Sequence, residues 1–569
     1  MKRYLKNTLM GLMASSMLSL TACTDLTENL YSTLNDTNID FDSEKDVASL
    51  MGQAIAQYRY MHCSWFGSWE LNEQCTDQYM VPFRVGIGWG DVYVNLHKHD
   101  WNYNLGHAEN IWNFAFGCIG YCNKVLDVMP AENAADRAQM RFFRAMTYYQ
   151  LLDYFRNVPI ETTLDVPDGY LPEQNTTQEV YEFCVKELTE IKEDIGTDKY
   201  FGYGNRWSVC MALAKLYLNK NVYLGTTGND GYEAALLEVN DIIDNGGYTL
   251  APKYSDCFRE NIDDNPEIIF AIPQDRTHAK HFLLHTYSFP QVGLEAFGCT
   301  ANATNGSCAV PQFIDSYDAA DNRLTDTWTG GKQKKAVKNS DGTYTSQAGD
   351  YIEYAEDDWA GEGILNYNKN VHSIDVPGAY KQEGYRMVKY EIVAGEYGTI
   401  ADDIPVFRLA DAMFIKAECL LRLGRDEQTA ADLVTEVRKR SFDAATKAVR
   451  SVAQLKGGSC YNYGHREYTC EGYANWDPAS YVSTTEGGAD IELGGLLDDL
   501  GWEFVGEQHR RQDLIRFKMT DGRSVYNGKS WFCKDATTES HWNYFPIPEQ
   551  AMRSNINLKQ NTGYTGATE

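Results

Sequence analysis

Hydrophobic positions recur at steps of three and four residues along most of this chain, which is the spacing of one face of an α-helix. The pattern predicts helices over residues 43–61, 108–129, 132–156, 176–194, 205–224, 231–245, 407–424, 427–442 and 492–516. Short breaks join 108–129 to 132–156, 205–224 to 231–245 and 407–424 to 427–442, so we expect these pairs to form antiparallel hairpins. Hairpins of this kind stack and bury a shared core in tetratricopeptide proteins. We therefore predict a mainly α fold: a tetratricopeptide-like helical-hairpin scaffold with long irregular loops and a few short strands.

The helical pattern is interrupted between residues 246 and 406, where short strand-like pieces such as 267–272 and 385–392 lie among Gly, Asn, Asp and Thr. A second irregular segment, 450–490, carries the sequence GGSCYNYGHREYTCEGYANW. Because loops on a rigid scaffold often carry recognition residues, both segments are candidates for binding.

Residues 1–22 have the pattern of a signal peptide: a basic start, an apolar run and a small pair before Cys23. The run is shorter than the about 20 apolar residues that cross a bilayer. Leu20-Thr21-Ala22-Cys23 resembles the bacterial lipobox, which predicts lipidation of Cys23. An ordinary signal peptide with a chance cysteine is the alternative. Residues 23–41 then form a polar, acidic tether, and 42–569 form the folded body.

Charge and aromatic content narrow the possible ligands. The net charge is −29, and removal of residues 1–22, which hold three basic and no acidic residues, lowers it to −32. This excess of acid disfavours nucleic acid and anionic lipid as partners, since phosphate groups bind basic surfaces. The chain has 38 Tyr and 12 Trp, whose rings combine a flat apolar face with a polar tip and so suit sugar rings.

The cysteines and histidines give weak signals for bridges or metals. Cys118 and Cys122 lie on one face of a predicted helix without a second pair, which favours buried core thiols over a metal site. The loop pairs Cys299/Cys308 and Cys460/Cys470 could form disulfides in an exported protein. Two histidines, at 97 and 99, have the spacing of one strand face, and surface positions are favoured over chelation. We expect no metal and no cofactor.

Several segments, taken in order, resemble the SusD/RagB family of outer-membrane nutrient-binding lipoproteins. They are RAQMRFFRAMTYYQLLDYFRNVPI (137–160), GGYTLAPKYSDCFRENIDDNPEIIFAIP (246–273), IPVFRLADAMFIKAECLLRLG (404–424), VRKRSF (437–442), EFVGEQHRRQDLIRF (503–517) and NYFPIPEQAMRSNINLKQNTGY (543–564). The chain departs from the family pattern at Arg156-Asn157, where the family usually has a Gly followed by an acidic or neutral residue before the VP pair, and in its large 450–490 segment. The resemblance covers nearly the whole chain and implies a single SusD-like domain over 42–569.

Charged residues inside these helical segments are interpreted as structural. Arg144, Arg408, Glu418 and Asp513 fall on helices that should pack, and we expect them to form buried ion pairs between hairpins.

The resemblance implies an oligosaccharide ligand, delivered to a SusC-like TonB-dependent β-barrel over which the protein sits as a lid. It also implies a lipid anchor in the outer membrane, with the body facing the cell exterior. The alternative is a lid or scaffold subunit of the transporter with peptide or other non-sugar cargo. We expect no catalysis, because no G-x-S-x-G elbow, HExxH helix, Walker loop or dinucleotide fingerprint occurs in the sequence.

The candidate binding region is 64–104, which holds four tryptophans and glycine-rich turns around Trp89. A stacked ring with charged groups reaching the sugar hydroxyls is the usual chemistry of such sites, so Asp77, Arg84 and Asp91 are the expected companions of Trp89. For Trp89 itself, packing inside the protein remains an open alternative.

Family resemblance adds loops of the middle segment to the site, with Phe297, Cys299, Arg386 and Tyr390 as candidates. The other tryptophans of the region, Trp65, Trp69 and Trp101, are expected to pack the loop against the helices.

Overall fold

The computed structural model describes residues 44–84, 89–279, 287–300, 302–356, 361–371, 373–374, 379–396, 401–468 and 481–566. The predicted signal peptide, Cys23 and the tether lie outside the described residues. The division between the two compact units of the chain falls between Leu50 and Met51, inside the first described helix, and the sites discussed below belong to the second unit.

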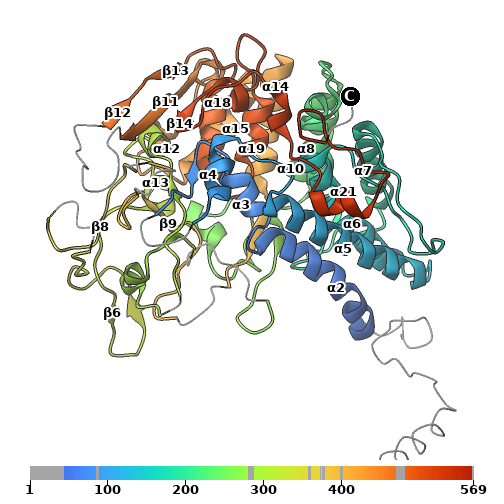
Figure 1. Cartoon of the computed structure of the whole chain (residues 1–569), viewed down its shortest axis with the longest axis horizontal. Coiled ribbons are helices and arrows are strands. Elements are labelled where there is room, and N and C mark those ends of the chain that lie inside the picture. The colour runs from blue at the N-terminus through green and yellow to red at the C-terminus, as the bar shows by residue number, and fades with distance from the viewer. Residues whose placement is uncertain are drawn as a thin grey trace, which may run out of the picture. The chain divides into compact units, whose positions relative to one another are not determined.

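The fold is mainly helical, as predicted (Figure 1). The longer helices are α2 Glu44–Cys63, α4 Asp91–Lys98, α5 Gly106–Val128, α6 Ala134–Phe155, α7 Thr177–Ile191, α8 Arg206–Leu218, α10 Asp230–Asn245, α14 Leu409–Leu423, α15 Glu427–Lys439, α18 Gly494–Phe504 and α19 Arg510–Arg516. The shorter ones are α3 Ser68–Glu73, α9 Lys220–Leu224, α12 Pro311–Ser316, α13 Arg323–Thr327, α16 Ala445–Ala448, α17 Val452–Lys456, α20 Val525–Gly528 and α21 Glu549–Ser554, with 3₁₀ turns η1 Tyr254–Phe258, η2 Gln291–Phe297 and η5 Ser540–Asn543. Among the described helices, none is both long and apolar enough to cross a bilayer.

The three predicted hairpins are confirmed: α5 packs on α6, α8 on α10, and α14 on α15, and α10 also packs on α14 (Figure 1). Two predicted helices are interrupted. The first divides at Asn219 into α8 and α9. The second divides into α18 and α19, because Gly506 and Gln508 between them have positive φ angles of 76° and 67°, which a helix cannot contain.

Short strands occupy the segments between the hairpins. The five-residue strands β2 Ile268–Ile272 and β10 Ile404–Arg408 pair antiparallel, with Ile404 opposite Ile272. The other short pairs are β1 Tyr79–Met80 with β3 Cys308–Ala309, β4 Trp328–Thr329 with β9 Arg386–Met387, β5 Gly331–Lys332 with β8 Asn366–Tyr367, and β6 Val337–Lys338 with β7 Tyr344–Thr345. Of the predicted strand 385–392, only β9 forms.

The 450–490 segment is more regular than the sequence indicated. Its long strand β11 Ser459–Tyr468 is the centre of a four-stranded sheet with β12 Tyr481–Ser483, β13 Glu486–Gly488 and β14 Trp531–Phe532. The pairing with β14 comes from a distant part of the chain, so local pattern could not reveal it.

Buried ion pairs between elements are confirmed for Arg144, Glu418 and Arg408, although Arg408 ends strand β10 and is not on a helix. Arg144 on α6 bonds Glu187 on α7 at 2.6 Å, and Arg516 on α19 bonds Glu418 on α14 at 2.8 Å. Among the described residues, Asp513 does not pair between hairpins as expected, because it bonds Arg516 one turn later on the same helix, α19, at 2.6 Å. Burial raises the pKa of Glu418, but Arg516 and Arg422 outweigh burial and lower it to about 2. These charges therefore hold neighbouring hairpins in a fixed register.

Cys299 and Cys308, which the sequence allowed as a disulfide pair, are both free thiols. The Cys299 Sγ contacts the backbone oxygens of Phe297 and Val393, whereas Cys308 on β3 is fully buried beside Gly384. Cys460 is an exposed thiol, and its proposed partner Cys470 lies outside the described residues. Cys118 and Cys122 are buried core thiols on α5, as expected.

Arg156, where the sequence departs from the family pattern, has an unusual backbone geometry. Arg156 follows α6 with φ 63° and ψ −76°, and the Asn157 N–H donates to the Phe155 oxygen across it at 2.7 Å. This is the rare and strained form of the γ-turn. The side chain compensates, because its Nη1 donates to the Leu152 and Asp153 oxygens at 2.7 and 2.8 Å. The guanidinium also lies 4.9 Å from the ring centroid of Tyr223.

Two substitutions at Arg156 separate the backbone strain from the side-chain bonds. Arg156→Ala loses the bonds and keeps the strain, whereas Arg156→Gly loses the bonds and relieves the strain. We expect both variants to unfold more easily than the wild type in urea, and Ala to be less stable than Gly by about 1 kcal/mol. Equal stability of the two variants would show that the turn carries no strain.

Candidate functional site

Trp65 and Trp89 form a stacked pair of indole rings. Their centroids are 5.4 Å apart and the ring planes differ by 6°. Trp65 lies in the turn between α2 and α3 and is 37% exposed, whereas Trp89, just before α4, is only 6% exposed. Trp65 therefore presents aromatic surface to the solvent, and Trp89 supports it from inside.

Contacts from the adjacent helix α4 and from the distant middle segment fix Trp89. Its Nε1 donates to the Thr304 oxygen at 3.0 Å, and Tyr93 and Tyr287 approach its ring edge-on at 5.4 and 4.9 Å. A Cβ at Gly306 would lie 2.7 Å from the Trp89 ring, so only glycine permits this close approach. The N-terminal region and the middle segment thus meet at one place, as the resemblance implied.

A buried carboxylate lies beneath the aromatic pair. One oxygen of Glu70 on α3 accepts bonds from the Tyr93 hydroxyl at 3.0 Å and the Phe66 N–H at 3.3 Å, and lies 2.8 Å from His107 Nε2. Burial, with Glu70 nearby, raises the pKa of Tyr93. The hydroxyl therefore stays protonated and keeps this bond, which makes the support of Trp89 rigid.

The tryptophans of this region are distributed differently from the sequence prediction. Trp65 was expected to pack and is the exposed ring, while the predicted platform Trp89 lies under it. The packing predicted for the other two is confirmed: Trp69 donates to the Gly506 oxygen at 2.9 Å and Trp101 to the Tyr564 hydroxyl at 2.7 Å. Asp91, the first residue of α4, keeps an exposed carboxylate two residues after Trp89.

Arg84 and Arg386 come together, but inside the protein. Arg84 Nε donates to the Gly306 oxygen at 3.1 Å, and Arg386 Nη1 donates to the Ser307 oxygen at 3.3 Å. Burial, with Arg84 nearby, lowers the pKa of Arg386 to about 9. Both guanidiniums are fully buried and bind backbone oxygens of loops, so the structure places them behind the site rather than within reach of a ligand.

Asp77 and Tyr390 are likewise interior residues. Both oxygens of Asp77 bind Arg510 on α19, at 2.7 and 2.6 Å, and Asp77 has no exposed surface. The Tyr390 hydroxyl donates to the Gly506 oxygen at 3.1 Å. The sequence prediction placed both near a ligand, whereas the fold uses them to join the middle segment and α3 to the α18–α19 connection.

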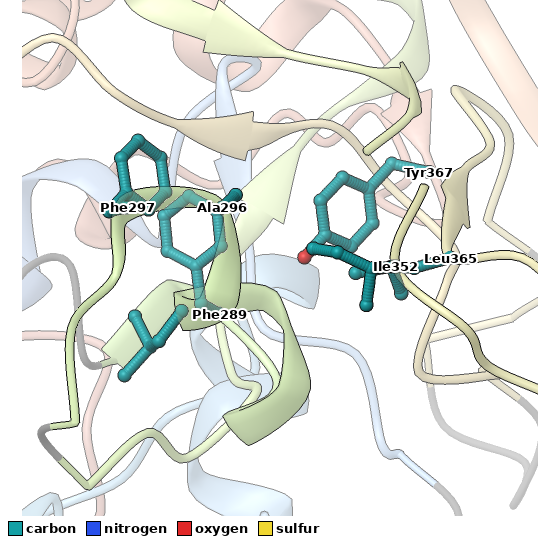
Figure 2. Close-up of a cluster of buried hydrophobic side chains, with 7 residues drawn as sticks. Phe289, Ala296, Phe297, Ile352, Leu365 and Tyr367 are labelled. Carbon is teal, nitrogen blue, oxygen red and sulfur yellow. The ribbon is translucent and has the colours of Figure 1, made fainter. Parts of the chain in front are cut away.

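Phe297 and Cys299 belong to a separate hydrophobic cluster. Figure 2 shows Phe297 beside Phe289 within this cluster, and their ring centroids are 5.5 Å apart. Cys299 is half-buried against the same cluster, and burial raises the pKa of its thiol. These two residues stabilise the loop-rich middle segment instead of lining the Trp65 surface.

The two histidines of this region are buried on or next to a helix, contrary to the expected surface strand. His97 is on α4, and burial lowers its pKa to about 3. His99 follows α4, and its Nε2 lies 2.9 Å from the Cys75 oxygen. The described residues contain no group of three or more His, Cys, Asp or Glu side chains arranged to hold a metal ion.

Sequence reasoning missed Tyr287, Glu70 and the exposure of Trp65. The position of Trp65, directly after a long helix and before Gly67, was the available signal for an exposed turn. A Cβ on Gly67 would lie 2.7 Å from the Ser64 oxygen, so the turn that raises Trp65 needs this glycine.

Comparison with family models identifies the chain. A model described as the SusD family matches residues 266–564. The chain belongs to the SusD family. A second model, described as "Starch-binding associating with outer membrane", matches residues 26–218 and associates this SusD-family chain with the outer membrane.

Individual relatives extend over most of the chain. The "Starch-binding protein SusD" of Bacteroides thetaiotaomicron is 25% identical over 531 residues, which are 88% of this chain and 83% of that protein. The "SusD-like protein P25" of Formosa agariphila is 22% identical over 476 residues, 79% of this chain and 73% of that protein. Both relatives therefore align with the body of the SusD-family fold and not with one fragment of it.

Solved structures share the fold. "B. fragilis NanU" has a TM-score of 0.64 at 19% identity and covers 94% of this chain and 99% of its own. A "Laminarin binding SusD-like protein" has a TM-score of 0.62 at 18% identity and covers 92% of this chain and 100% of its own. The tetratricopeptide-like hairpin scaffold predicted from periodicity is thereby confirmed, as is the SusD fold implied by the resemblance.

Proposed function

We propose that this SusD-family protein is a cell-surface glycan-binding lipoprotein that captures an oligosaccharide at Trp65. The observation that carries the proposal is the exposed Trp65 ring, held flat by Trp89 and by a buried hydrogen-bond network. A rigid aromatic face offers apolar contact to a sugar ring with little loss of side-chain entropy. The names of the relatives, starch-binding and laminarin-binding, support a saccharide ligand.

Among the residues predicted from sequence, Trp89 and Asp91 remain part of this proposed site. Trp89 supports the stacking ring, and the exposed Asp91 carboxylate accepts hydrogen bonds from sugar hydroxyls. Asp77, Arg84, Phe297, Cys299, Arg386 and Tyr390 act indirectly, because they hold the loops around the site.

Family membership supports the cellular setting that we propose. A lipid on Cys23 anchors the protein in the outer membrane, with the acidic body facing the cell exterior. The captured oligosaccharide passes to a SusC-like TonB-dependent transporter, over which the protein closes as a hinged lid. The protein binds and releases its ligand without catalysis.

Replacing Trp65 by alanine is expected to weaken oligosaccharide binding at least tenfold, about 1.4 kcal/mol, because the stacking surface is lost. The measurement is isothermal titration calorimetry on protein starting at Thr24, with starch, laminarin, xylan, mannan and host-glycan oligosaccharides. Trp65→Ala is a sharper test than Trp89→Ala, since removal of the buried Trp89 would also disturb the fold.

Tyr351→Ala is the matched control, because Tyr351 is also an exposed aromatic residue, 45% accessible, on a loop of the middle segment. It should bind like the wild type. Full binding by Trp65→Ala would place the site elsewhere, and failure of the wild type to bind any glycan, together with binding of peptides, would favour non-sugar cargo.

A further inference from the structure

A concave site lies away from Trp65, on the helical-hairpin scaffold. It is a pocket of about 190 Å³ between the α7–α8 connection and the segment that precedes β2. Lys199, Tyr200 and Tyr203 form one wall, and Tyr248, Asp263 and Asp264 line it from the other segment. No residue of the Trp65 site lines this pocket.

The walls of the pocket are fixed by hydrogen bonds. Gln139 on α6 binds both backbone groups of Gly204, at 2.7 and 2.9 Å. Asn205 caps α8 through its side-chain oxygen, and its Nδ2 donates to the Tyr248 hydroxyl at 3.3 Å. The connection is therefore joined to α6 and to the opposite wall, so the pocket is formed before a ligand arrives.

The side chains at the opening are available to a ligand. Tyr200 is 69% exposed although its backbone oxygen accepts the Tyr203 N–H at 3.1 Å, so its ring is presented on an ordered turn. Asp263 and Asp264 are exposed, and among the described residues neither forms an ion pair with a basic side chain. An aromatic face and two carboxylates thus border the same hollow.

Charge limits the class of ligand. The Lys199 Nζ lies 3.5 Å from the centroid of the Tyr248 ring and donates to the Gly247 oxygen. The face of Tyr248, where a cationic ligand could bind, is therefore already occupied by the ammonium group of Lys199. A second cation would be repelled by Lys199. An anion would be repelled by Asp263 and Asp264 and by the net charge of −29. A neutral ring rich in hydroxyl groups can use both the carboxylates and the ammonium.

We propose that this pocket is a second saccharide-binding site, in which one sugar ring stacks on Tyr200 and its hydroxyls bond to Asp263, Asp264 and Lys199. Its volume is below the roughly 300–1,000 Å³ of sites that enclose drug-sized ligands, so it holds a single ring of a longer chain. The proposal rests on the glycan function proposed above. It adds that a polysaccharide contacts the protein at two places, which raises its apparent affinity by multivalency.

The test compares long and short forms of whichever glycan of the five-member panel binds the wild type. Native gel electrophoresis through the polysaccharide measures binding of the long form, and calorimetry with a tetrasaccharide measures the Trp65 site. Tyr200→Ala should weaken polysaccharide retention about tenfold while it changes tetrasaccharide affinity less than twofold. In the Trp65→Ala protein, the residual retention should disappear when Tyr200→Ala is added, and when Asp263→Asn and Asp264→Asn are added together.

Tyr351→Ala again serves as the control, since a lysine also lies over its exposed ring, with the Lys334 Nζ 5.4 Å from the centroid. Retention of Tyr200→Ala equal to that of Tyr351→Ala would overturn the second site and leave the Trp65 site intact. Loss of retention in Tyr200→Ala with full binding by Trp65→Ala would overturn only the Trp65 site. If the wild type binds no glycan of the panel, both proposals fail.

Discussion

Replacing Arg408 by methionine is expected to lower the free energy of unfolding by about 3–5 kcal/mol. Arg408 on β10 is 1% exposed and bonds three glutamates: Nη1 lies 2.9 Å from Glu267 and 2.8 Å from Glu503, and Nε lies 2.7 Å from Glu507. Methionine fills part of the space of the arginine side chain. It carries no positive charge and no N–H donors, so the three buried carboxylates lose part of the charge and hydrogen bonding that stabilise them.

The network around Arg408 explains why the effect should be large. Arg440 at the end of α15 and Arg323 on α13 also bond Glu503, at 2.7 and 2.9 Å. Burial would raise the pKa of Glu503, but Arg440, Arg408 and Arg323 together hold it well below its usual range. Glu503 is therefore ionised in the interior and depends on all three guanidiniums.

Urea unfolding of Arg408→Met and the wild type at pH 7 measures this difference. Arg425→Met is the control, because the Arg425–Glu233 pair is half exposed and such surface pairs contribute about 0–1 kcal/mol. If Arg408→Met lowers the free energy of unfolding by less than about 1 kcal/mol, the remaining arginines are sufficient to balance the negative charge of the three glutamates.

Replacing Glu73 by glutamine is expected to remove part of the pH dependence of stability. Glu73 on α3 is fully buried and accepts the Gln508 N–H at 2.6 Å. Burial outweighs this hydrogen bond and the nearby Lys389, and raises the pKa of Glu73 from 4.5 to about 8. The folded state therefore holds a proton here at neutral pH, while the unfolded state releases it.

This difference in proton binding sets the direction in which stability changes with pH. Because the folded pKa is the higher one, the stabilising contribution is complete below about pH 4.5 and is lost as the pH rises to about 8. Glutamine keeps the acceptor for the Gln508 N–H and cannot ionise. Between about pH 5 and 8, the free energy of unfolding of the variant should rise relative to that of the wild type by about 1.4 kcal/mol per pH unit.

Urea unfolding at pH 5.5, 6.5 and 7.5 tests this prediction. Glu132→Gln is the control, because it makes the same replacement of glutamate by glutamine at an exposed position. Burial also raises the pKa of Asp403 to about 7 and of Asp498 to about 6, but both remain in wild type and variant and cancel in the comparison. A constant difference across the three pH values would show that Glu73 is ionised in the folded protein.

The short connection between α18 and α19 holds partners of both Arg408 and Glu73. Gly506 accepts hydrogen bonds from Trp69 and Tyr390, Glu507 binds Arg408, and Gln508 binds Glu73. These partners come from the N-terminal region, the middle segment and β10. The sequence indicated a continuous helix here, because the apolar period continues through the break, and only the converging partners explain the two positive φ angles.

Periodicity and order of motifs in the sequence determined the mainly α class, the three hairpins, the charged residues that lock them and the resemblance to the SusD family. These depend on local spacing, which one helix face expresses directly. Tertiary structure alone decided which tryptophan is exposed. Both rings contact Tyr287, but only Trp89 also donates to the Thr304 oxygen and packs against Gly306, and both residues lie more than 200 positions after it in the chain. It also decided that Asp77, Arg84 and Arg386 are interior residues, since burial depends on distant partners that a pattern of residue types does not specify.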